Sequence, residues 1–116
     1  MDILIKDLEI AIQRSVPLVS ISTEDQYHVI RRITDMIDNA EDPKLKKRGL
    51  ILWNCVDGLD ALNDRGKAAL NEVRQSLIEY EGMPAEQKRF GQDFSTMLLA
   101  IRCYLPQQNI VISMNI

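Results

Sequence analysis

The sequence VPLVSISTEDQYHV, residues 16–29, contains the pattern that indicates the fold class of the chain. It opens with a short apolar run rich in β-branched residues, turns polar at the four residues STED, and then starts an amphipathic pattern. A strand that passes through a tight polar turn into a helix is the basic unit of an α/β fold. The phosphate-binding turn of nucleotide-binding proteins is rich in glycine and ends in lysine and serine or threonine. This turn has no glycine and two acids, so the stretch predicts an α/β fold without that loop.

The rest of the chain repeats this alternation. The spacing of apolar residues predicts helices over residues 2–15, 24–39, 64–81 and 93–105, and strands over residues 18–21, 50–56 and 109–114. We expect Thr23 to cap the second helix, Asp93 or Ser95 to cap the fourth, and Phe94 to face inward. Alternating strands and long helices imply parallel pairing, so we expect a three-layer α/β sandwich. Its small, mostly parallel sheet would have three strands flanked by about four helices, and the polar residues 82–92 would form a loop.

Length and composition limit the class of protein. A chain of 116 residues has the size of one domain, and its 46% apolar and 27% charged residues are typical of globular proteins. The net charge of −3 gives no electrostatic reason to expect nucleic acid as a partner. The chain lacks an apolar run long enough to cross a bilayer and a cationic, apolar leader, so we expect a cytoplasmic protein without a membrane. Cys55 and Cys103 lie in apolar runs, and we expect buried free thiols in a reducing compartment.

The sequence offers no catalytic motif and no metal-binding set. The five glycines are scattered and none belongs to a Gly-Lys-Ser/Thr sequence, so the segment has neither a P-loop nor a Rossmann fingerprint. The single histidine, His28, lies on an expected helix, and one histidine with two distant cysteines does not make a metal site. The serines lack the G-x-S-x-G elbow of a nucleophile.

Polar residues at the carboxyl ends of the expected strands mark the one edge where we would look for a small-molecule site. Thr23 and Glu24 follow the first strand, Asp57 follows the second, and Asn115 follows the third. Ligands of open α/β sheets bind at this edge. Asp57 would suit a magnesium-binding carboxylate, yet Asp57-Gly58 is also a good turn sequence, and acids such as Glu24 are common at helix starts. Both interpretations stay open.

Three further features have a functional and a structural interpretation. Ile3 and Ile10 make the first helix apolar on more than one side, which indicates either a docking helix or additional core residues. The basic turn with Lys44, Lys46, Lys47 and Arg48 is either a solvated loop or a surface for an acidic partner. Trp53 lies within an apolar strand, where a core position is favoured over a binding platform.

Several of these segments also resemble a known family. PLVSI at residues 17–21, TED at 23–25, an arginine at 31 or 32, LWNCVDGL at 52–59 and IVIS at 110–113 resemble the N-terminal part of AAA-type ATPases of the plastid and cyanobacterial type. The resemblance implies a single degenerate RecA-like domain over residues 1–116, without a working P-loop, placed ahead of an ATPase module. The family carries a further strand before its last helix, and residues 83–92 are too polar to form one, so the size of the sheet stays open.

The resemblance implies a non-catalytic interaction or assembly domain at the N-terminus of an AAA-type ATPase. Its partners would be the ATPase module, another protomer in a homo-oligomer, or a regulatory protein. The segment itself would hold no cofactor, and ATP and magnesium would act only through a downstream module, of which this chain would be the N-terminal part. Two alternatives remain: a strand-end ligand-binding or Mg-dependent phosphotransfer enzyme that uses Asp57 and Glu24, and a stand-alone viral or host-modulating binding protein.

Overall fold

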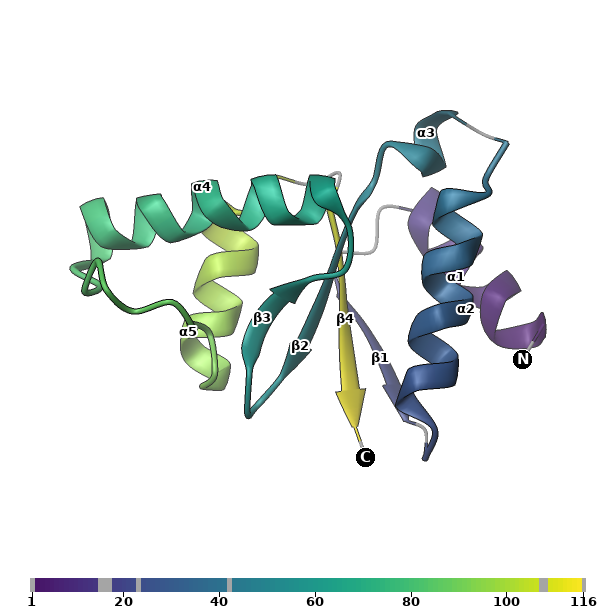
Figure 1. Ribbon diagram of the computed structural model, residues 1–116, viewed down its shortest axis with the longest axis horizontal. Coiled ribbons are helices and arrows are strands. Elements are labelled where there is room, and N and C mark those ends of the chain that lie inside the picture. The colour runs from purple at the N-terminus through teal and green to yellow at the C-terminus, as the bar shows by residue number, and fades with distance from the viewer. Residues whose placement is uncertain (1, 15–17, 23, 42, 107–108, 116) are drawn as a thin grey trace.

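The computed structural model describes residues 2–14, 18–22, 24–41, 43–106 and 109–115 (Figure 1). The elements in chain order are α1 (Asp2–Gln13), β1 (Leu18–Ser22), α2 (Gln26–Asp38), α3 (Pro43–Lys46), β2 (Gly49–Asn54), β3 (Gly58–Ala61), α4 (Asp64–Glu81), α5 (Phe94–Leu99), the π-helical turn η1 (Ala100–Tyr104) and β4 (Asn109–Asn115). The expected helix over residues 64–81 is confirmed to the residue, and the other long elements shift at their ends.

The sheet has the strand order β1-β4-β2-β3 within the described residues. β4 lies inside the sheet and pairs in parallel with β1 on one side and β2 on the other. β3 pairs antiparallel with β2 at the outer edge. The expected mostly parallel sheet is therefore confirmed, whereas the expected number of three strands is wrong by one.

The additional strand, β3, follows from the turn at residues 55–57. The sequence predicted that Asp57-Gly58 closes the second strand, but it extended that strand to Val56, whereas β2 ends at Asn54. The Asn54 side chain binds the turn, and Gly58 adopts a left-handed φ of 74°, so the chain reverses and pairs with β2. A four-residue strand, GLDA, is too short to show a period in the sequence.

Helices cover both faces of the sheet (Figure 1), which confirms the three-layer sandwich. On one face, Leu50, Ile110 and Ile112 pack with buried residues of α1 and α2. On the other face, Ile51 and Val111 pack with α4, α5 and η1. Successive residues of β2 and β4 thus serve opposite cores, as expected for interior strands whose side chains alternate. The chain passes from β1 to β2 through α2 and α3, and from β3 to β4 through α4, α5 and η1. As a result β1, β4 and β2 run parallel.

Four local expectations need correction. Asp25, whose carboxylate accepts a hydrogen bond from the His28 N–H at 3.2 Å, caps α2, so the expected Thr23 cap is wrong; Thr23 itself lies outside the described residues. Phe94 is exposed: it is the first residue of α5, directly after the Asp93 cap, and Met97 is the buried residue of this helix. Cys55 and Cys103 are free, but both are exposed. Residues 43–46, expected as part of a turn, form the short helix α3.

Candidate functional site

The carboxyl ends of three parallel strands meet at one edge of the sheet, which we call the carboxyl edge. Ser22 of β1 is paired with Asn115 of β4, and the end of β2 lies beside β4 (Figure 1). Glu24 follows β1 as an exposed residue, and Asp57 lies in the turn that follows β2. The structure therefore brings Glu24, Asp57 and the backbone of Asn115 to one edge, as the sequence predicted, while Thr23 lies outside the described residues.

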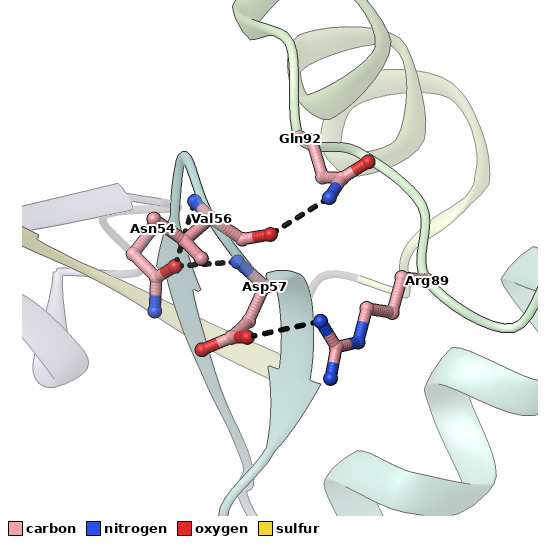
Figure 2. Close-up of polar contacts among 5 residues, drawn as sticks. All are labelled: Asn54, Val56, Asp57, Arg89 and Gln92. Carbon is pink, nitrogen blue, oxygen red and sulfur yellow. Dashed lines mark hydrogen bonds and ion pairs between the residues drawn. The ribbon is translucent and has the colours of Figure 1, made fainter.

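Asp57 belongs to a turn that is held from both sides (Figure 2). The Asn54 side-chain oxygen accepts hydrogen bonds from the backbone N–H groups of Val56, at 3.0 Å, and Asp57, at 2.7 Å. The Gln92 side-chain amide donates to the Val56 carbonyl at 2.7 Å. The Asp57 carboxylate lies 3.6 Å from the Arg89 guanidinium. Asp57 thus faces a cation of its own chain, which favours the structural interpretation of this residue over a metal ligand.

The polar segment at residues 82–92 is a loop, as predicted, and the structure shows how it is fastened to the sheet. Its Phe90 carbonyl accepts from the Leu59 N–H at 3.0 Å, and its Gly91 carbonyl accepts from the Trp53 indole N–H at 2.5 Å. Phe90 is buried, and a Cβ at Gly58 would collide with the Phe90 carbonyl. The loop therefore supports the turn at residues 55–57 through main-chain and side-chain contacts.

An apolar group protrudes where this loop meets the turn. Val56 is 67% exposed and Phe94 is 60% exposed. The Phe94 ring meets the half-buried Trp53 ring edge to face, with the ring centroids 6.4 Å apart. Trp53 packs on the core, as the sequence favoured, but one side of it also serves this surface. We call Trp53, Val56 and Phe94 the edge patch; exposed apolar groups of this kind are typical of interaction surfaces.

Charged side chains of both signs lie at the carboxyl edge, since Asp57 is paired with Arg89. Asp57 is adjacent to the edge patch in sequence, and Asp93 caps α5 by accepting hydrogen bonds from the Thr96 backbone N–H and hydroxyl, each at 2.9 Å. The pKa of Asp93 lies below its usual value, mainly because its carboxylate accepts the hydrogen bond from the Thr96 N–H. This carboxylate therefore stays charged in mild acid. Glu24 and Asp25 add charge at the start of α2. The carboxyl edge thus combines exposed apolar groups with exposed acids, of which Asp57 is paired with Arg89.

The opposite end of the sheet, which we call the amino end, is basic and hollow. A cavity of about 230 Å³ opens between the starts of β2 and β4 and the first turns of α4. Lys47 and Arg65 supply cations to its wall, Glu72 supplies an anion, and Ala68 and Pro106 supply apolar surface. Sequence analysis found the basic residues at 44–48 but not the cavity, because Arg65 and Pro106 reach it only through the fold.

Asn63 ties this end together, and sequence analysis overlooked it. Its side-chain oxygen accepts from the Gly66 N–H, at 2.8 Å, as the N-cap of α4, and from the Leu50 N–H, at 3.0 Å. Its amide nitrogen donates to the Arg48 carbonyl at 3.0 Å. One side chain therefore binds the start of α4 to the start of β2. The signal that could have found it is an asparagine directly before a helical pattern.

The remaining residues that the sequence singled out lie on helices α1 and α2. His28 is exposed on α2. Ile10 is 47% exposed on α1, whereas the side chain of Ile3 lies outside what the structure describes. Across the described ranges, no three histidine, cysteine or acidic side chains come close enough to hold a metal ion.

A second cavity, of about 370 Å³, lies beneath the loop between the end of α4 and α5. Near it, the Tyr104 hydroxyl donates to the Glu81 carboxylate at 2.6 Å, and this bond raises the pKa of Tyr104 to about 12.

None of the helices in the described part combines the length and apolar character that a membrane crossing requires. No known protein family, curated protein or solved structure matches the chain.

Proposed function

We propose that this chain is a non-catalytic interaction and assembly domain, of the kind that precedes the ATPase module of AAA-type ATPases, and that it binds a protein through the carboxyl edge. The observation that carries the proposal is the exposure of Val56 and Phe94 beside Trp53, at the edge where α/β proteins bind their ligands. A surface that combines exposed apolar groups with charged groups of both signs suits a protein partner with an apolar group and polar surroundings.

A partner that covers the exposed side chains of the edge patch gains free energy from their burial. Burying a valine or phenylalanine side chain that was exposed contributes roughly 1.5–3 kcal/mol. Aromatic residues at the centre of an interface carry a large share of its binding energy. Here Phe94 is held in place by its contact with Trp53. The two side chains can act as anchors of a larger contact.

The edge is ordered before any partner arrives. The turn that carries Val56 is bound by Asn54 and by Gln92, and the loop behind it is bound to Trp53 and Leu59. Binding therefore immobilises few additional groups, and the entropy lost on association is small. This preorganisation supports a docking role for the edge.

The geometry gives less support to the alternative, which is a Mg-dependent phosphotransfer site at Asp57 and Glu24. β4 separates the strands that these acids follow, so the strand ends start roughly 9–10 Å apart at the usual strand spacing. The Asp57 carboxylate also lies beside Arg89. A magnesium ion binds its ligands at about 2.0–2.1 Å, so both acids would need to leave their present surroundings.

Site-specific photo-crosslinking tests the proposal. A benzophenone amino acid replaces Val56 in one variant and, as the control, Tyr80, which is 72% exposed on α4. In cells or extracts of the source, we expect protein adducts from position 56 and not from position 80. Equal labelling at both positions, or none at either, would contradict a docking edge.

Nucleotide addition tests the non-catalytic part separately. We expect Mg-ATP to leave the thermal midpoint of the domain unchanged. A stabilisation that Asp57→Asn abolishes would support the phosphotransfer alternative instead. The assignment to an AAA-type ATPase is checked by the reading frame itself, which should continue past Ile116 into a Gly-Lys-Thr-containing segment.

A further inference from the structure

The turn at the carboxyl edge and the cavity at the amino end lie at opposite ends of the sheet. The turn between β2 and β3 lies at the carboxyl edge of the sheet, and it carries Val56, 67% exposed, next to the acid Asp57 (Figures 1 and 2). The cavity of about 230 Å³ lies at the other end of β2. One copy of the chain therefore carries an exposed turn at one end of its sheet and a hollow at the other.

The two features also have complementary chemistry. The cavity wall combines apolar surface from Ala68 and Pro106 with the cations Lys47 and Arg65. An isopropyl group followed by a carboxylate, as at Val56-Asp57, would place its apolar part against the alanine and proline and its charge beside the cations. A cavity of roughly 150 Å³ holds a benzene molecule, so this larger one has room for a valine side chain.

We propose that the Val56-Asp57 turn of one copy docks into the amino-end cavity of a second copy. This inference rests on the proposed function, because it names the partner of the carboxyl edge. Among the described residues, Lys47 and Arg65 make no ion pair within their own chain, and the Arg65 guanidinium donates only to the Lys47 carbonyl, at 3.4 Å. The Asp57 carboxylate of the second copy would exchange its exposed contact with Arg89, at 3.6 Å, for these two cations.

The geometry makes the contact head to tail. The turn and the cavity lie at opposite ends of β2, so a pair of bound copies leaves one turn and one cavity free. A contact between two different surfaces continues into a ring if its rotation closes, and into a filament otherwise. Assembly is therefore expected to pass beyond the dimer.

Charges both oppose and favour the association of two copies. Each copy carries a net charge of −3, so two copies repel one another at long range, and the attraction depends on the local acid–cation contact. The opposing charges lie close together in the contact, while the general repulsion acts over more than a Debye length. Glu72 also lines the cavity and repels an incoming Asp57, so Glu72→Gln should strengthen association.

Two complementary variants test the contact. The first, V56S/D57S, removes the apolar and acidic groups of the turn, and the second, K47E/R65E, reverses the charge of the cavity wall. All four side chains are exposed, so both variants are expected to keep the wild-type fold, which circular dichroism and thermal midpoints verify. Sedimentation velocity over a range of protein concentrations measures the assembly of the wild type, of each variant and of the equimolar mixture.

We expect the wild type to form species larger than dimers with rising concentration, and each folded variant to associate at least about tenfold more weakly. The mixture should form a heterodimer and nothing larger, because one intact turn meets one intact cavity and no second contact is available. A wild type that stays monomeric, variants that assemble like the wild type, or a mixture that stays monomeric would each overturn the inference. If the wild type is monomeric while position 56 still crosslinks to another protein, the inference fails and the proposed function stands.

Discussion

The two ends of the parallel sheet differ in charge, in relief and in how they are built. At the carboxyl edge, helices α2 and α5 begin with the caps Asp25 and Asp93, and a fastened turn is exposed. At the amino end, Asn63 ties β2 to α4, and a cavity opens beside Lys47. Parallel strands place the starts of the following helices at their carboxyl ends, where the helix dipole favours acids. The acidic caps at one end thus follow in part from the fold itself.

The direction of β3 contributes to the difference between the two ends of the sheet. Because β3 runs antiparallel to β2, it returns the chain to the amino end before α4 begins. Helix α4 therefore starts beside the first residues of β2, and its first turns supply Arg65 and Ala68 to the cavity. A fourth parallel strand in place of β3 would have left the amino end without this wall.

The largest expected effect comes from the glycine that lets the turn lie against the loop. Gly58→Ala should destabilise the fold by roughly 3 kcal/mol, because the residue has a φ of 74° and its new Cβ would meet the Phe90 carbonyl. Gly82→Ala is the matched control, with a φ of 73° and open space around it, and should cost only about 1 kcal/mol. Urea unfolding of both variants measures the difference. Equal losses would show that the loop does not restrain the turn.

The next effect concerns the amino end. Asn63→Ala should lower the free energy of unfolding by about 2 kcal/mol, because it removes the cap of α4 and leaves the Leu50 N–H without its acceptor. Asp25→Ala, which removes the cap of α2 at the carboxyl edge, should cost about 1 kcal/mol. The comparison is made by chemical denaturation at neutral pH. A smaller loss for Asn63 than for Asp25 would mean that the two ends are not tied as differently as the contacts indicate.

The ion pair in the turn should matter little for stability. Asp57 and Arg89 are 3.6 Å apart and their side chains are 51% and 70% exposed, so Asp57→Asn and Arg89→Ala should each change the free energy of unfolding by less than about 0.5 kcal/mol. Thermal denaturation of both variants checks this value. A loss several times larger would assign Asp57 a structural role in the turn and weaken its use as a charge for docking.

The smallest effect appears only in acid. The pKa of Asp93 is lowered in the folded state, so its stabilising contribution is complete above the unfolded pKa of about 3.9 and is lost as the pH falls through the lower folded pKa. Asp93→Asn should therefore flatten the fall of the thermal midpoint with pH in this window. The midpoints of the two proteins should approach each other in stronger acid. Parallel curves at all pH values would show that the Asp93 carboxylate is not held in its charged form.

The elements with long patterns could be predicted from the sequence, and the short or locally determined ones could not. The helix at residues 64–81 has five buried apolar residues or glycines at helical spacing, and its bounds were predicted correctly. Strand β3 has only four residues, and its pairing depends on the left-handed Gly58 and on Asn54. The π-helical turn after Leu99 was also missed, because the same apolar spacing fits an ordinary helix.

The candidate site shows the same division. The sequence predicted which acids gather at the carboxyl edge, because parallel strands end together. It did not predict the exposure of Phe94, which depends on the position of the residue directly after the Asp93 cap. Nor could it predict the pairing of Asp57 with Arg89, since 31 intervening residues must fold before the two meet. Contacts made by loops across long separations carry no periodic signal.

An amide chemical-shift titration by concentration tests most directly whether the two ends of the sheet bind each other. The amide signals of residues 55–57 at the carboxyl edge and of residues 47–49 and 65–69 at the amino end should move together as the protein concentration rises. The signal of Tyr80, which is 72% exposed, should stay in place. Shifts confined to one end of the sheet, or the absence of any concentration dependence, would contradict the pairing of these two surfaces.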